Sequence, residues 1–80
     1  MTQTQTRPLY RIAHEIYGDW TNVYFGAVPY LDAMSELDGI DEYYYLDSAR
    51  SVVLYFLSNA STWRGETARR IKAELKGMLA

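Results

Sequence analysis

Apolar residues recur every three or four positions through most of this 80-residue chain, and this spacing is the strongest constraint on its fold. A period of 3.6 residues places such residues on one side of an α-helix, where they can be buried together. Thr6 is a suitable N-cap for the first helix, and Pro8 suits its first turn because no amide proton is needed there. The pattern predicts a helix over residues 8–20, with a stripe of Leu9, Ile12, Ala13, Ile16, Tyr17 and Trp20.

Three further segments show the same spacing. The second predicted helix begins near Ala27 and ends at Gly39, because glycine adopts the left-handed conformation that closes helices. The third spans residues 47–59 with Asp47 as its N-cap, and it is apolar on almost every side, which is typical of a central helix. The fourth spans residues 63–78, capped by Ser61 or Thr62. The three stripes consist of Ala27, Tyr30, Leu31, Met34 and Leu37, then Ala49, Val52, Val53, Phe56, Leu57 and Ala60, then Ala68, Ile71, Leu75 and Met78.

These stripes predict an all-α fold, a small bundle of three to four short helices. Residues 40–46 do not follow the helical spacing, and tyrosine favours extended backbone, so this segment is a short strand, a loop or the lead-in to the next helix. A hairpin of residues 43–46 against residues 52–57 competes with the third helix, since a short apolar run does not distinguish strand from helix. The helix is favoured because its spacing extends over residues 49–60.

Length and composition predict one soluble domain. We expect a flexible tail at residues 1–7, followed by a single helical domain at residues 8–80. The tail lacks the apolar segment of a secretory signal, and the longest apolar run, residues 52–57, is far below the roughly 20 residues that a membrane-spanning helix needs. The chain contains no cysteine, which fits a reducing cytoplasm and excludes disulfides and thiolate metal sites. We therefore expect a cytoplasmic protein that makes no membrane contact.

Three consecutive tyrosines beside acidic residues form the strongest candidate for a partner-binding site. The chain contains eight tyrosines, and residues 32–47 contain six acidic residues and no basic residue. Tyrosine combines a large contact area with a polar hydroxyl and is enriched at protein interfaces. Neighbouring residues of a strand or helix point in different directions, so at least one of the three is expected to join the core. The acids favour a partner with a basic surface. The candidate partner-binding residues are Asp41, Glu42, Tyr43, Tyr44, Tyr45 and, as an outlying anchor, Trp63.

The last predicted helix supports an alternative function. Residues 59–62 would form a short turn between two helices, which is the outline of a helix-turn-helix DNA-binding unit. The residues available for phosphate contacts are Arg64, Arg69, Lys72 and Lys76. The whole chain nevertheless has a net charge of −2, which opposes binding to DNA. Nucleic acid is therefore a weaker expectation than a protein partner.

No catalytic residue, cofactor or metal site can be assigned. His14 is the only histidine, and it lies on the flank of the first predicted helix with no nucleophile or carboxylate paired to it. The acids around Gly39 lack the ligand spacing of a calcium loop. The glycines and serines fall outside the motifs that bind phosphate or activate a nucleophile. The sequence favours a non-enzymatic interaction protein.

Three stretches of the chain carry a resemblance to other proteins: YFGAVPYLDAM (24–34), DSARSVVLYFLSNA (47–60) and TWRGETARRIKAEL (62–75). On the basis of these stretches, residues 9–79 resemble small uncharacterised proteins encoded by bacteriophages of actinobacteria. The resemblance brings no catalytic residue. It implies a phage accessory protein that binds and modulates a bacterial host protein in the host cytoplasm. Independently of the resemblance, so small and tyrosine-rich a domain can complete its core in a homodimer, which is a further expectation.

Overall fold

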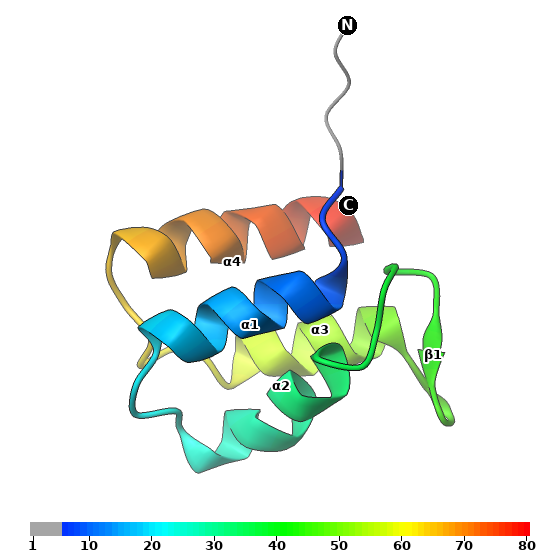
Figure 1. Cartoon of the computed structure of the whole chain (residues 1–80), viewed down its shortest axis with the longest axis horizontal. Helices are drawn as coiled ribbons and strands as arrows, with labels where there is room; N and C mark the ends of the chain where they lie inside the picture. Colours follow the sequence, from blue (N-terminus) through cyan, green and yellow to red (C-terminus); the bar gives the residue numbers. More distant parts are fainter. Residues whose placement is uncertain (1–5) are drawn as a thin grey trace, which may run out of the picture.

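Four stretches of the chain form α-helices in the computed structural model, which describes residues 6–80. They are α1 (Leu9–Asp19), α2 (Val28–Met34), α3 (Ala49–Ser58) and α4 (Glu66–Leu79), and a short 3-10 helix, η1 (Phe25–Ala27), leads into α2 (Figure 1). The strands β1 (Tyr43–Tyr44) and β2 (Asp47–Ser48) form an antiparallel hairpin before α3. The prediction of a mostly helical fold is confirmed. The fold is not purely α, because residues 43–48 pair as strands.

The apolar stripes of the helices meet in one core. α1 contacts α2 and α4, and Figure 1 shows α1 and α4 lying side by side. Burying a large apolar side chain contributes about 1.5–3 kcal/mol, so these stripes supply most of the force that drives folding. The largest fully buried side chains are Leu9, Ile12, Ile16, Leu31, Met34, Val53, Phe56, Trp63, Ile71 and Leu75.

α3 is covered on one side rather than all round. It contacts α2, α4 and β2, but Leu54 and Tyr55 lie on its exposed side. Its nearly uniform apolar composition predicts a central helix, and that prediction is wrong for its outer surface. The buried residues of α3 are Ala49, Val52, Val53 and Phe56.

The beginning of α3 differs from the predicted one. Ser48, rather than Asp47, is the N-cap, and its hydroxyl accepts a hydrogen bond from the Ser51 amide at 3.1 Å. Asp47 instead belongs to β2 and pairs with Tyr44. The cap therefore lies at the point where the hairpin ends and the helix begins.

The other helices also begin or end at different residues. α4 starts at Glu66, not near residue 63, because Trp63 turns into the core and Gly65 reverses the chain with a φ of 112°, which glycine adopts without strain. α2 ends at Met34, before the predicted end at Gly39. Pro8, rather than Thr6, occupies the N-cap of α1.

Arg7 ties the start of the described chain to α1 and α4. Its guanidinium contacts Glu15 at 2.8 Å and Glu74 at 2.7 Å, and Arg70 also contacts Glu15. The hydrogen bonds to Glu74 and Glu15 raise the pKa of Arg7, and those from Arg70 and Arg7 lower the pKa of Glu15. These contacts attach Arg7, the last residue of the predicted tail, to the helices. Residues 1–5 of that tail lie outside the described residues.

Candidate functional site

The tyrosine-acid segment forms the hairpin. Tyr43 pairs with Ser48 and Tyr44 with Asp47, which leaves Tyr45 and Leu46 as a two-residue turn. Of the three alternatives for residues 40–46, the short strand is observed for residues 43–44. The competing hairpin against residues 52–57 is wrong, because those residues lie in α3.

Side chains alternate between the two sides of β1, as in any strand. Tyr43 is 69% exposed and Tyr45 is 83% exposed, whereas Tyr44 is half-buried against the core. The ring of Tyr44 meets the ring of Tyr45 edge-on, with centroids 4.8 Å apart. The expectation that one of the three tyrosines joins the core is met only in part, because Tyr44 packs against the core without being part of it.

Leu46 belongs to the same surface, although the sequence prediction omitted it. It lies in the turn and is 96% exposed. Together, Tyr43, Tyr45 and Leu46 form the apolar end of the hairpin, which we call the hairpin tip. The sequence carries no signal for Leu46, because the turn that exposes it lacks the glycine or asparagine usual in a tight hairpin.

The acidic residues beside the hairpin tip have different roles. Asp41 contacts Arg50 at 3.3 Å, and such an exposed pair contributes little to stability. The Glu42 carboxylate accepts a hydrogen bond from the Asp38 amide at 2.9 Å, so it shapes the chain before β1. Asp47 is exposed on β2. Asp47 therefore gives the tip a negative border, whereas Asp41 is paired with Arg50 and Glu42 contributes to the structure of the chain before β1.

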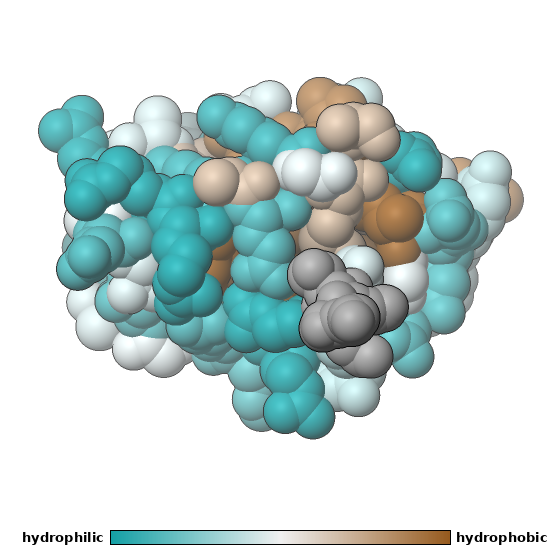
Figure 2. All heavy atoms as spheres, turned by 90° about the horizontal axis from the view of Figure 1, so that it is seen from above, coloured by the Kyte–Doolittle hydropathy of each residue, from teal (hydrophilic) through white to brown (hydrophobic). Residues whose placement is uncertain are grey.

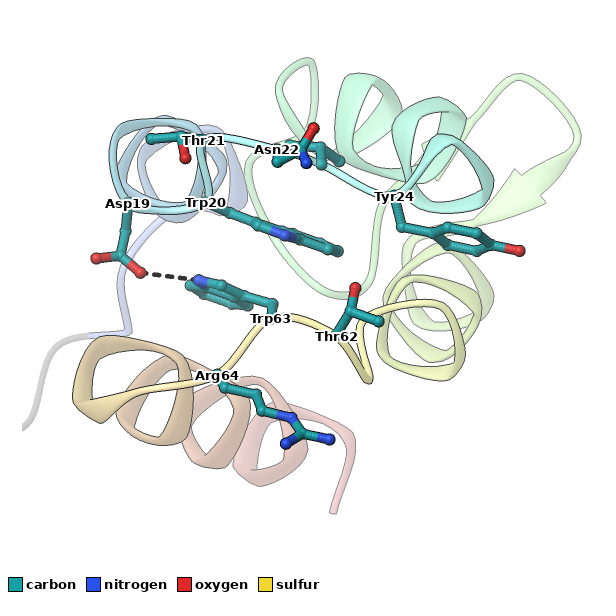
Figure 3. A pocket seen from close by; sticks show the side chains of 9 residues that line it. Asp19, Trp20, Thr21, Asn22, Tyr24, Thr62, Trp63 and Arg64 are labelled. Atoms are coloured by element: carbon teal, nitrogen blue, oxygen red, sulfur yellow. Dashed lines mark hydrogen bonds between the residues drawn. The ribbon is translucent and has the colours of Figure 1, made fainter.

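Trp63 lies in the core and not on a surface that faces a partner. It is 2% exposed, and its ring stacks on Trp20 with centroids 5.7 Å apart. Its Nε1 donates a hydrogen bond to Asp19 at 2.8 Å, drawn as a dashed line in Figure 3. Polar side chains, among them Thr21 and Asn22, line an open cleft of about 580 Å³ beside the two indoles. The prediction of Trp63 as an anchor is wrong, because this buried indole stabilises the core.

The basic residues of the DNA-binding alternative follow α4 and the loop before it. Arg64, Arg69 and Lys76 are exposed, and the side of the molecule that carries α4 is mostly hydrophilic (Figure 2). Lys72 is half-buried and donates a hydrogen bond to the Trp63 carbonyl at 2.6 Å. Burial, followed by repulsion from Lys76 and Arg64, lowers the pKa of Lys72. One of the four predicted phosphate contacts is thus engaged within the protein.

The connection between α3 and α4 also differs from a helix-turn-helix. α3 ends at Ser58 and α4 begins at Glu66, so residues 59–65 separate the two helices. A helix-turn-helix uses a turn of about three or four residues. The longer connection, with Trp63 inserted into the core, gives the DNA-binding alternative no geometric support.

Side chains that could bind a metal ion do not converge in the described part of the chain. His14 is exposed on α1. Within residues 6–80, the structure brings together no group of three or more His, Asp or Glu side chains that could hold a metal ion. The hairpin tip is therefore the strongest candidate site in these residues.

Comparisons with known proteins assign no family. The chain matches no protein-family model, and no curated protein or solved structure shows significant similarity to it. Among the described helices, none has the length and apolar character needed to cross a bilayer. The function must therefore be argued from the geometry of the hairpin tip and its surroundings.

Proposed function

We propose that this protein is a non-enzymatic interaction module that binds another protein through the hairpin tip. The observation that carries the proposal is the high exposure of Tyr43, Tyr45 and Leu46 at the end of one hairpin. Clustered apolar side chains in water are typical of binding surfaces. Burying each of them against a partner would contribute about 1.5–3 kcal/mol, which is the magnitude found at interface hot spots.

The backbone of Tyr45 supports the same proposal. Its φ of 57° lies in the left-handed region, which costs a residue other than glycine about 1–2 kcal/mol. The two-residue turn needs a positive φ at this position, where glycine or asparagine is usual, and the exposed tyrosine side chain found there does not serve the core. Strained residues of this kind are concentrated in binding sites. The edge-on contact with Tyr44 orients the ring before binding, which reduces the entropy lost on association.

The charge around the hairpin tip indicates the chemistry of the partner. Asp47 is exposed beside the tip, and a basic surface would be attracted to it and would associate faster. We propose a bacterial host protein with a basic surface as the partner. A role as a phage accessory protein that modulates this host protein in the bacterial cytoplasm agrees with the resemblance of residues 9–79 to actinobacteriophage proteins.

Replacing two tip residues tests this function. The tagged wild-type chain is used to capture proteins from a bacterial lysate, and the captured partner is identified by mass spectrometry and purified. Isothermal titration calorimetry then measures its Kd for the wild type and for the double variant Tyr45→Ala, Leu46→Ala. We expect the double variant to bind about 100-fold more weakly, because truncating two central contact residues costs about 3 kcal/mol.

The matched control is Tyr10→Ala, which truncates a tyrosine on α1 that is 42% exposed and lies outside the hairpin tip. The control should bind with wild-type affinity. Circular dichroism of both variants checks that helical content is kept. Equal affinity of the double variant and the wild type for the purified partner would contradict the proposal.

A further inference from the structure

Two segments without charged residues pack against each other in the fold. Residues 20–31 and 51–63 contain no Asp, Glu, Lys, Arg or His. The Tyr30 ring on α2 lies 5.4 Å from the Tyr55 ring on α3. Gly26 lies so close to its neighbours that a Cβ there would be 2.5 Å from the Tyr24 ring and 2.8 Å from the Asn59 side chain. The two segments therefore form one surface, which we call the uncharged face.

The uncharged face exposes large side chains. Phe25 is 79% exposed and Tyr55 is 55% exposed, and Tyr24 is 43% exposed. Since an aromatic side chain offers about 200 Å², these three side chains present roughly 350 Å² to solvent. That area is somewhat less than half of the roughly 800 Å² that each partner buries in a standard interface. The three side chains are therefore large enough to form the centre of an interface.

We propose that the uncharged face binds a second copy of this chain and forms a two-fold symmetric homodimer. In such a contact the same patch of both copies is used, so a patch with net charge would repel itself. The uncharged face avoids this repulsion, because the two charged residues that line the cleft beside Tyr24, Asp19 and Arg64, have opposite signs. The hairpin end exposes Asp47 beside the Asp41–Arg50 ion pair, and α4 exposes the bases Arg69 and Lys76, so a symmetric contact through either surface would bring charged residues of the two copies together.

Ring contacts within the uncharged face favour association. Tyr24 and Phe25 lie with centroids 4.9 Å apart, and Tyr30 and Tyr55 form a second pair across α2 and α3. These contacts hold the rings in place before the second copy arrives, so little side-chain entropy is lost. The tyrosine hydroxyls can remain hydrogen-bonded to water or to the second copy while the rings are buried.

The uncharged face is separate from the hairpin tip. In Figure 1 the hairpin lies at one end of the molecule, whereas the segment leading into α2 lies along its lower edge. A dimer formed through the uncharged face leaves both hairpin tips free. Two tips on one particle would raise the apparent affinity for a partner with repeated sites. The dimer therefore adds to the proposed function without depending on it.

Sedimentation equilibrium tests the dimer. The purified chain is measured from about 1 µM to about 500 µM, a range that covers moderate affinities. We expect a monomer–dimer equilibrium. Phe25→Glu should raise the dimer Kd at least about tenfold, because two carboxylates then face each other in an apolar contact. Tyr55→Glu should do the same from the surface of α3, and both variants should keep their circular dichroism spectra because both side chains are exposed.

Leu46→Glu is the matched control, since it also replaces an exposed apolar residue by glutamate, but at the hairpin tip. Its dimer Kd should equal that of the wild type. Raising the salt concentration should not weaken the dimer, because no ion pair holds it. A monomer over the whole concentration range, an unchanged Kd in both Phe25→Glu and Tyr55→Glu, or loss of the dimer in Leu46→Glu would overturn the proposal.

Discussion

The hairpin tip and the uncharged face both expose aromatic side chains, but they differ in backbone and in charge. The tip is formed by a strand and a two-residue turn, with Tyr45 in the left-handed region and acids beside it. The uncharged face is built mainly on helical backbone, η1, α2 and α3, and residues 20–31 and 51–63 carry no charge. The difference teaches that tyrosine content alone does not define an interaction site. The neighbouring charges decide whether a foreign basic surface or a second copy fits best.

Among the substitutions that distinguish the two surfaces, Gly26→Ala should have the largest effect, because it disturbs only the uncharged face. The added Cβ would lie 2.5 Å from the Tyr24 ring, so the ring must move away. We expect the dimer Kd to rise about tenfold in sedimentation equilibrium, equivalent to about 1.4 kcal/mol. The affinity of the hairpin tip for its partner should not change.

Gly18→Ala is the control for this substitution. A Cβ at Gly18 in α1 meets no atom within 4 Å, so the substitution should leave the dimer intact. It should also stabilise α1 by about 0.5–1 kcal/mol, since alanine is the better helix former. A dimer weakened equally by both substitutions would show that Gly26 has no particular role in the uncharged face.

At the hairpin tip, Tyr45→Gly separates the effect of backbone strain on stability from the effect of ring contacts on partner binding. Glycine adopts a φ of 57° without strain, so the free energy of unfolding should increase, by at most about 1 kcal/mol. Partner binding should weaken because the ring is lost. Urea denaturation measures the first effect and calorimetry the second. Tyr43→Gly, at a strand position, should weaken both stability and binding. A destabilised Tyr45→Gly variant would contradict the account of strain at the tip.

Glu15→Gln should have the smallest effect, because Glu15 joins α1 to Arg70 of α4 and belongs to neither surface. The hydrogen bonds from Arg70 and Arg7 lower the pKa of Glu15 below its ordinary value of 4.5. The ionised carboxylate therefore stabilises the fold above that ordinary value, and this contribution is lost as the pH falls through the lower, folded-state pKa. We expect the free energy of unfolding at neutral pH to fall by about 0.5 kcal/mol, the value of a partly exposed ion pair.

Urea denaturation of the wild type and of Glu15→Gln at about pH 7 and about pH 3 checks this expectation. The difference in stability between the two proteins should shrink at the lower pH. A difference that stays the same at both pH values would show that the ionised carboxylate contributes nothing. Dimer and partner affinities at neutral pH should equal those of the wild type.

The helices were predictable because their apolar spacing is regular over many residues. Leu9, Ile12 and Ile16 are buried on α1, and Ile71 and Leu75 are buried on α4, as their spacing predicts. The beginning of α4 was not predictable, since Trp63 is held in the core by stacking on Trp20 and by a hydrogen bond to Asp19, which are both far away in the sequence. Local patterns contain no information about such a distant contact.

Both interaction surfaces were only partly visible in the sequence. The tyrosine triplet drew attention to residues 43–45, but the turn lacks the glycine or asparagine that usually marks a tight hairpin, so the pairing and the role of Leu46 were missed. The two uncharged segments can be read directly from the sequence. That they lie against each other follows only from the packing of α2 on α3.

The stacked indoles of Trp20 and Trp63 also make the molecule convenient for spectroscopy. They are the only two tryptophans of the chain, and both are buried. The hairpin tip and the uncharged face contain tyrosine, phenylalanine and leucine as their large exposed side chains instead. Indole fluorescence thus reports whether the interior is intact, without contribution from the exposed side chains of either surface. A variant that loses binding but keeps the indole fluorescence of the wild type has therefore lost a contact and not its fold.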